Sequence, residues 1–287
     1  MIIIVGSIVV TLCVIGGFVM GGGHIGALLH INELIIIGGG AFGALMIMSP
    51  KKVLQDMVKG LLVSLKGAPH NREAYEDLLK VLYELFLLGR RNGMIALEEH
   101  VLEPANSAIF KKYPLFSGNR HAMEFLCGSL RPIIDGKIKP DQLRLLLDVE
   151  IERLESEHHA PVNVLTKTAD AMPGFGIVAA VLGIVITMAS ISGPVELIGE
   201  HVAAALVGTF LGILLSYGFL NPLATNMEFI GAAELDHTRC IAACVIGFAG
   251  GMAPVTAVEL GRRGLSSEMR PTADEMERMF KALKTAK

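Results

Sequence analysis

Lysine and arginine are absent from two long stretches of this 287-residue chain, residues 1–50 and residues 170–222. All 25 basic residues lie in 51–169 or in 223–287. Charged residues of both signs make up 18% of the chain, whereas soluble domains usually contain about 25%. This scarcity excludes an ordinary soluble globular domain and indicates a membrane protein with a sizeable soluble part.

Cysteine is also scarce, and none of the four cysteines has the CxxC spacing of a zinc or redox site. Cys240 and Cys244 stand four residues apart, but two thiols without further ligands make a poor zinc site. The sequence shows no pairing of a nucleophile with a base and no phosphate-binding loop. We therefore expect no enzyme activity, no metal, no cofactor and no nucleic-acid partner.

Four apolar runs occupy the stretches without basic residues. A helix that crosses a bilayer needs roughly 20 apolar residues. The predicted fold class is all-α, a polytopic membrane protein with four transmembrane helices and a helical cytoplasmic domain. The predicted segments are transmembrane helices 1 and 2 in 1–50 (about 1–20 and 34–50), the cytoplasmic domain in 51–170, transmembrane helices 3 and 4 in 171–222 (about 171–191 and 202–222), and a cytoplasmic helical tail in 223–287.

The charge distribution also predicts the orientation, because positively charged loops stay in the cytoplasm. The links 21–33 and 192–200 then face outward, and both termini and the large loop lie inside a bacterial inner membrane. The first run resembles a signal peptide. It lacks a basic n-region and a cleavage site, so we interpret it as a retained helix in contact with lipid.

Local signals predict the helices of the cytoplasmic part. Asn71 is expected to cap one helix, the turn at 90–93 to end it, and Asp141 to cap a long later helix. The uncharged stretch 240–258 is long enough to be a fifth span. Glycines and Pro254 interrupt it, and a fifth span would place the basic tail outside, so we interpret it as a buried cytoplasmic helix.

Small and hydroxyl residues recur at helical spacing on one face of each of the last two spans. The third span shows Gly176, Ala180, Gly183, Thr187 and Ser190; the fourth shows Ala205, Gly208, Thr209, Gly212 and Ser216. Two interpretations are open. Such faces let transmembrane helices pack closely, or they line a narrow polar path and receive a partner helix.

No ionisable residue is expected in the middle of any span. Glu33, Asp170, Glu196, Glu200 and His201 all stand at span ends or in links. A proton path through lipid needs a titratable group, which is placed there only at considerable cost. If this chain moves ions, another subunit must therefore bring the carboxylate.

Several motifs resemble those of the MotA family, the A subunits of flagellar motor stators. They are ALVGTFLGIL followed after seven residues by Pro222, PGFGIVAAVLGIV from Pro173, GRRNGMIALEEHVLEP from Gly89, and GGMAPVTAVELGRR from Gly250. The resemblance covers essentially the whole chain. The related TolQ and ExbB proteins share the last two spans but have three spans in all, so the paired N-terminal helices favour MotA.

The resemblance implies partners and an ion. MotA subunits are expected to form a homo-oligomeric ring of five around two copies of MotB, which brings a transmembrane aspartate, and to turn the rotor through FliG. Sodium-driven relatives carry threonine seven residues after the proline of span three. Ala180 stands there, which favours protons, although Thr187 offers another hydroxyl. The alternatives are a TolQ/ExbB-type energy-transducing motor and a structural membrane scaffold.

The resemblance also implies roles for individual residues, each with a plainer alternative. Pro173 and Pro222 match two family prolines that couple protonation to movement of the cytoplasmic domain. The plainer alternative is that they only mark the start or the end of a helix. Arg90 and Glu98 match a charged pair that contacts FliG. Arg91 would share this role, and Glu150 is a weaker candidate. The plainer alternative is that these are ordinary surface charges in contact with water. The ion path or partner-helix face would comprise Thr209, Ala180, Gly176, Thr187, Gly212, Ser216 and Tyr217.

Overall fold

The computed structural model describes residues 2–67, 71–189 and 191–285. The described residues form helices and connecting turns, and none of them lies in a β-strand. The all-α prediction is confirmed. Ser190, which the sequence placed on the small face of the third span, lies outside the described residues.

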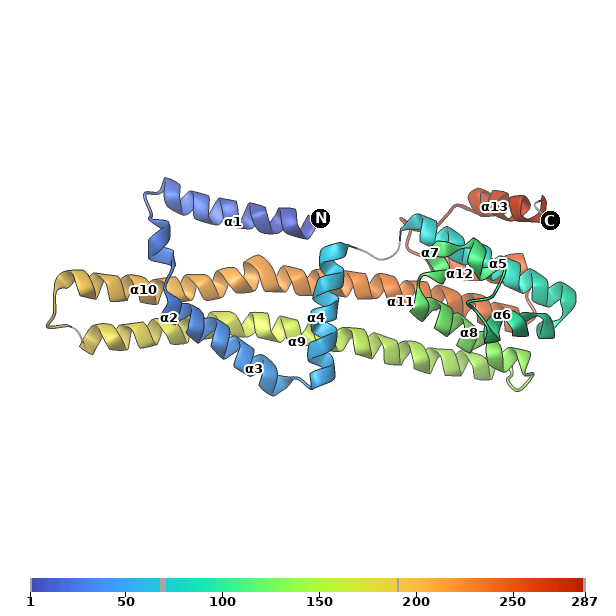
Figure 1. Ribbon diagram of the computed structural model, residues 1–287, viewed down its shortest axis with the longest axis horizontal. Coiled ribbons are helices and arrows are strands. Elements are labelled where there is room, and N and C mark those ends of the chain that lie inside the picture. The colour runs from blue at the N-terminus through green and yellow to red at the C-terminus, as the bar shows by residue number, and fades with distance from the viewer. Residues whose placement is uncertain (1, 68–70, 190, 286–287) are drawn as a thin grey trace. The chain divides into compact units, whose positions relative to one another are not determined.

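The chain divides into two compact units, and the labels used here are those of Figure 1. Unit 1 comprises Met1–Gly67 and Glu157–Ile230; unit 2 comprises Ala68–Ser156 and Gly231–Lys287. The predicted boundaries between membrane and cytoplasm do not coincide with this division, because 51–67 and 157–170 belong to unit 1. That topology stays a prediction.

Unit 1 contains the apolar helices. Its elements are α1 (Ile2–Met20), the 3-10 turn η1 (Ile25–Leu28), α2 (Ile31–Leu34), the π-helix η2 (Ile35–Gly39), α3 (Gly40–Met48), α4 (Lys51–Lys66), the later part of α9 (Pro140–Ala189), α10 (Val195–Ile213), the π-helix η5 (Leu214–Leu220) and the start of α11 (Asn221–Ala249). Among the described residues, four helical segments are long and apolar enough to cross a membrane: Ile2–Met20, Ile25–Met48, Pro140–Ala189 and Val195–Ala249. This agrees with the four predicted spans.

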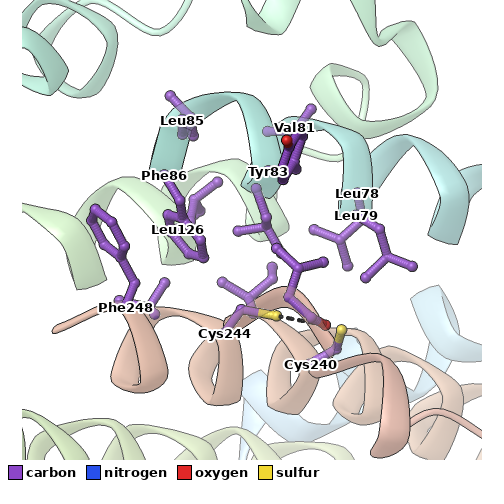
Figure 2. Close-up of a cluster of buried hydrophobic side chains, with 14 of the residues drawn as sticks. Leu78, Leu79, Val81, Tyr83, Leu85, Phe86, Leu126, Cys240, Cys244 and Phe248 are labelled. Carbon is purple, nitrogen blue, oxygen red and sulfur yellow. Dashed lines mark hydrogen bonds between the residues drawn. The ribbon is translucent and has the colours of Figure 1, made fainter. Parts of the chain in front are cut away.

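Unit 2 contains α5 (Arg72–Asn92), η3 (Met94–Leu97), α6 (Glu98–Leu102), η4 (Phe110–Lys112), α7 (Pro114–Ser117), α8 (Arg120–Ile134), the first part of α9, the rest of α11, α12 (Pro254–Arg263) and α13 (Ala273–Thr285). Its core forms where α5 meets α11, as Figure 2 shows. Phe86 stacks on Phe248 with ring centroids 4.3 Å apart, and Tyr83 stacks on Phe280 at 4.0 Å. Burial of such aromatic pairs stabilises this unit.

The uncharged stretch 240–258 belongs to this core. α11 ends at Ala249, Gly251 adopts a positive φ of 83°, and α12 begins at Pro254. Cys240 and Cys244 are buried, and α12 packs on them through Gly261, where a Cβ atom would lie 2.1 Å from the Cys244 sulfur. The stretch is a buried helix–turn–helix, so the prediction of a buried and interrupted segment is confirmed.

The predicted helix caps and the predicted turn of the cytoplasmic part have mixed outcomes. Asn71 caps α5 as predicted, because its side-chain oxygen accepts a hydrogen bond from the Ala74 amide at 2.9 Å. The turn predicted at 90–93 is confirmed only at Gly93, which has a φ of 85°, because α5 continues to Asn92. The cap predicted at Asp141 is wrong. α9 already begins at Pro140, whose fixed φ suits a first helical position, and Asp141 lies inside the first turn.

Candidate functional site

Two glycines of the predicted ion path lie in a close contact between helices of this same chain. α9 and α10 run side by side in unit 1 (Figure 1). A Cβ atom on Gly176 would lie 2.9 Å from the Gly208 carbonyl oxygen, and one on Gly212 would lie 2.6 Å from the Met172 carbonyl oxygen. For these two glycines the packing interpretation holds, because the neighbouring backbone covers them and leaves no open face for a partner helix.

Other members of the predicted face are placed differently. Thr209 and Ala180 are half-buried. Thr187 is buried, and its hydroxyl donates to the Gly183 carbonyl oxygen of its own helix at 2.8 Å. That bond commits the donor of Thr187 to its own backbone. The role of Thr209 towards another subunit stays a prediction.

Pro222 stands inside a helix rather than at its end. α10, the π-helix η5 and α11 follow one another without a break, so the interpretation of Asn-Pro as a helix stop is wrong. Proline removes a backbone donor, and its ring clashes with the carbonyl four residues earlier. A wider π turn just before it shifts that carbonyl. Such π segments occur mostly as single turns inside α-helices and often at functional sites.

The π segment also places two predicted residues. Ser216 is fully buried, whereas the Tyr217 side chain is 64% exposed. Tyr217 lines a surface hollow of about 470 Å³ next to Pro222. The other residues that line it are Asn221, Pro222, Thr225, Asn226 and Phe229. Ser216 thus lies inside the protein and Tyr217 on its surface, although both were predicted to belong to the ion path or partner-helix face.

A polar link that the sequence did not predict joins α11 to α9. The Asn221 side-chain amide donates to the Asp170 carboxylate at 3.2 Å and lies 3.4 Å from the Ser216 hydroxyl oxygen. Asp170 precedes Pro173 by three residues, and Asn221 directly precedes Pro222. The hydrogen bond therefore ties together the two helical segments that carry the predicted coupling prolines. Pro173 itself is half-buried within α9.

Glu33, which the sequence predicted to stand at the end of a link, is buried, with its side chain only 7% exposed. It continues a buried stripe of the second apolar segment, with Ile37 and Ala41 four and eight residues further on. Its Cγ atom lies 3.4 Å from where a Cβ atom on Gly208 would stand. One carboxylate oxygen, Oε2, is buried and finds no hydrogen-bond partner among the described residues.

The predicted rotor-contact residues lie on one exposed corner of unit 2. Arg90 and Arg91 lie in the last turn of α5, and Glu98 begins α6, so they flank the short turn segment of Gly93 and η3. Leu97 anchors this turn, since it is fully buried and packs where a Cβ atom on Gly89 would stand. No ion pair engages the three charged side chains within the part of the chain that the structure describes. They are therefore available to a partner.

Glu150, the weaker candidate, lies on a different helix of unit 2. It is exposed on α9. The structure thus groups Arg90, Arg91 and Glu98 on one corner by chain connectivity, while Glu150 is not part of that turn. A shared role for all four residues stays a prediction.

An ion pair inside α12 orients a buried arginine that links this helix to the following segment. Arg262 is buried and forms a bidentate ion pair with Glu259. Its Nε atom donates to Oε2 at 2.6 Å, and its Nη2 atom donates to Oε1 at 2.7 Å. Its third nitrogen donates to the Pro271 carbonyl oxygen at 2.7 Å. Hydrogen bonds from Arg262, supported by Arg263, hold the pKa of Glu259 at about 2. This cluster joins α12 to the segment that leads into α13.

Family models match two parts of the chain. Residues 4–93 match the model described as Motility protein A N-terminal, and residues 118–228 match that of the MotA/TolQ/ExbB proton channel family. Motility protein A of Salmonella typhimurium is 39% identical over 284 residues, which cover 99% of this chain and 96% of the relative. Chemotaxis protein LafT of Vibrio parahaemolyticus is 37% identical over 273 residues, covering 95% of this chain and 96% of LafT.

Solved structures share the fold. A chain of the C. jejuni MotAB structure superposes with a TM-score of 0.78 at 21% identity, covering 94% of this chain and 98% of that one. The flagellar MotAB stator complex of Bacillus subtilis gives a TM-score of 0.74 at 24% identity, covering 99% of this chain and 98% of that one. At these identities the likeness establishes the fold alone. Together with the two family models and the relatives of nearly equal length, the identity along almost the whole chain places this protein in the Motility protein A branch of the MotA/TolQ/ExbB proton channel family.

Proposed function

We propose that this chain is the A-type stator subunit of a bacterial flagellar motor, embedded in the inner membrane with both termini and its large loop in the cytoplasm. The observation that carries the proposal is the 39% identity to Motility protein A along 99% of the chain. The orientation rests on the basic residues, all of which lie in the two segments assigned to the cytoplasm.

The subunit acts with a MotB-type partner, in a ring of five A subunits around two copies of the partner. The related solved complexes contain MotA together with MotB. The chain's own sequence supports a partner, because it offers no aspartate within the third and fourth spans between Ala171 and Leu220. The partner helix brings the aspartate that is protonated at each step, and Thr209 lies beside it.

Movement follows from that protonation. An aspartate that loses or gains charge changes its attraction to the polar groups of α10, which shifts the helix contacts around it. The Asn221–Asp170 hydrogen bond and the two prolines, Pro173 and Pro222, transmit the shift. α9 and α11 each contribute residues to both units, so they are the elements through which a change in unit 1 reaches unit 2.

Torque is delivered by the exposed corner of unit 2. Arg90, Arg91 and Glu98 contact the rotor protein FliG through charge pairs, with Glu150 in a minor role. Charge pairs at an exposed surface are individually weak, roughly 0 to 1 kcal/mol. Weak pairs suit a contact that forms and breaks at every step, and they explain why several charges are needed.

The driving ion is the proton. A dehydrated sodium ion needs several oxygen ligands, whereas a proton needs only the partner's carboxylate and a path of water. Ala180 offers no side-chain oxygen, and the hydroxyl of Thr187 is bonded to the Gly183 carbonyl. Both features favour proton transport.

The TolQ/ExbB-type alternative is tested in cells. The match of residues 4–93 to the Motility protein A N-terminal model favours the flagellar role. Deletion of the gene should abolish swimming while flagella still assemble and the outer membrane stays intact. Normal swimming together with a leaky outer membrane would contradict the proposal and favour the energy-transducing alternative.

A further inference from the structure

Glu33 is an acid buried among the apolar helices, and the steps proposed so far do not use it. Its side chain is 7% exposed, and no residue that the structure describes donates a hydrogen bond to its Oε2 atom. Its Cγ atom contacts the surface of α10 at Gly208, the residue before Thr209. An acid of this chain therefore lies beside the segment that is expected to meet the partner's aspartate.

A purely structural role does not explain this arrangement. A buried carboxylate oxygen without a donor loses its hydration and gains nothing in return. Ile37 and Ala41 occupy the same stripe and need no polar neighbour. An apolar residue would pack there at lower cost. Ionisable residues in membrane segments are rare and mark ion paths or proton relays.

We infer that Glu33 is a proton-binding residue on the outer side of the ion path, from which protons pass to the partner's aspartate. This inference rests on the proposed function and on its orientation, in which the link before α2 and the start of α10 face outward. The Glu33 carboxylate takes a proton from water at the outer surface and becomes a carboxylic acid. It then gives that proton to the ionised aspartate, so one O–H bond breaks, another forms, and nothing is oxidised or reduced.

The elements packed against α2 carry few other titratable groups. His24 and His30 flank η1, and α10 carries Glu196, Glu200 and His201 near its start. His201 lies seven residues before Gly208, two turns along the same face of α10. Within the described part of the chain, its Nδ1 atom is also buried without a hydrogen-bond partner. A second unpartnered titratable group therefore lies on the same face of α10 as Gly208.

The first test measures proton flux into vesicles that contain the chain together with its partner subunit, with a pH-sensitive dye inside. We expect Glu33→Gln to lower the flux at least about tenfold, since a positioned proton-transfer group contributes a rate factor of about 100 or more. Glu33→Asp keeps the acid and should restore most of the flux. Glu196→Gln removes an exposed acid at the start of α10 and should leave the flux unchanged.

The outcomes separate this inference from the proposed function. If the wild-type complex conducts no protons, the proposed function fails. If the wild type conducts and Glu33→Gln conducts within about tenfold of it, with the same dependence on external pH, the assignment of Glu33 is overturned.

A second readout does not depend on transport. The infrared spectrum of the assembled complex should show a carboxylic-acid carbonyl band that appears as the external pH falls and that is missing in Glu33→Gln. The rescue variant Glu33→Asp should show the band again at a shifted frequency. A pH-dependent spectrum that is the same in wild type and Glu33→Gln would also overturn the inference, even if the variant assembles poorly.

Discussion

The Asn221 side-chain amide donates a hydrogen bond to the Asp170 carboxylate across 3.2 Å, between α11 and α9. Each of these residues stands within three positions of a proline of its own helix, Pro222 and Pro173. A helix that contains proline lacks one backbone hydrogen bond and bends more easily there. The bond between the two side chains therefore links a proline-containing segment of α9 to a proline-containing segment of α11.

The first prediction concerns this link. Asn221→Ala should leave the stator assembled but reduce the torque of the motor, because the two bending points would move independently. A hydrogen bond of this kind contributes about 0.5 to 1.5 kcal/mol, so stability should change little. Thr225→Ala is the matched control, since the Thr225 hydroxyl is exposed and bonds only to the Asn221 carbonyl of its own helix. Full torque in Asn221→Ala would show that the link plays no part in coupling.

The second prediction concerns the contact between α9 and α10. Gly212→Ala would place a Cβ atom 2.6 Å from the Met172 carbonyl oxygen, a backbone atom that cannot rotate away. Forced contacts of this kind typically destabilise by about 1 to 3 kcal/mol. The midpoint of thermal unfolding in detergent should fall. Gly174→Ala is the control, because a Cβ atom there meets nothing within 4 Å. Equal midpoints for the two variants would refute the packing.

The third prediction concerns the exposed corner of unit 2. The triple variant Arg90→Glu, Arg91→Glu and Glu98→Lys should assemble at wild-type levels but fail to drive swimming. Single variants should be mild, because exposed charge pairs each contribute roughly 0 to 1 kcal/mol. The control is Arg270→Glu, which reverses an exposed charge elsewhere in unit 2. Normal swimming of the triple variant, measured in soft agar and by cell tracking, would remove this corner from the rotor contact.

The fourth prediction concerns pH. The hydrogen bonds from Arg262 lower the pKa of Glu259 from 4.5 to about 2 in the folded chain. The ionised carboxylate therefore stabilises the fold fully above about pH 4.5, and this contribution is lost as the pH falls from about 4.5 to about 2. At pH 7, Glu259→Gln should destabilise the chain by about 1 to 3 kcal/mol, as expected when a charged hydrogen-bond partner is removed.

Thermal unfolding across this pH range checks the sign. The difference between wild type and Glu259→Gln should be largest at neutral pH and should shrink towards pH 2. Glu268→Gln, an exposed acid nearby, should show no such dependence. A difference that grows as the pH falls would contradict the assigned role of the Arg262–Glu259 pair.

The sequence predicted what depends on local chemistry. The Asn71 cap and the Gly93 turn follow from the preferences of single residues, and the apolar runs follow from composition. Two features escaped it because each depends on a neighbour distant in the chain. Glu33 is buried and lies against Gly208 of α10, and the Asn221–Asp170 bond joins residues 51 positions apart.

The π-helix before Pro222 was missed for a different reason. The sequence left a helix end at Asn221-Pro222 open as the plainer alternative to a coupling role. The chain avoids that stop with a wider turn, which no single residue preference indicates. Ser216 and Tyr217 are adjacent, so even a regular helix points their side chains about 100° apart, which accounts for their different exposure.

If this chain converts proton flow into rotation, the speed of the motor must depend on the proton-motive force. Moving one elementary charge through the membrane potential releases about 2.3 kcal/mol per 100 mV, so speed should follow the driving force of the transported ion. Speed is measured on single tethered motors in a strain whose only stator A subunit is this chain. We predict that speed rises with proton-motive force at constant external sodium and stays unchanged when sodium is varied at constant proton-motive force. A speed that follows the sodium gradient and ignores the proton-motive force would contradict the account.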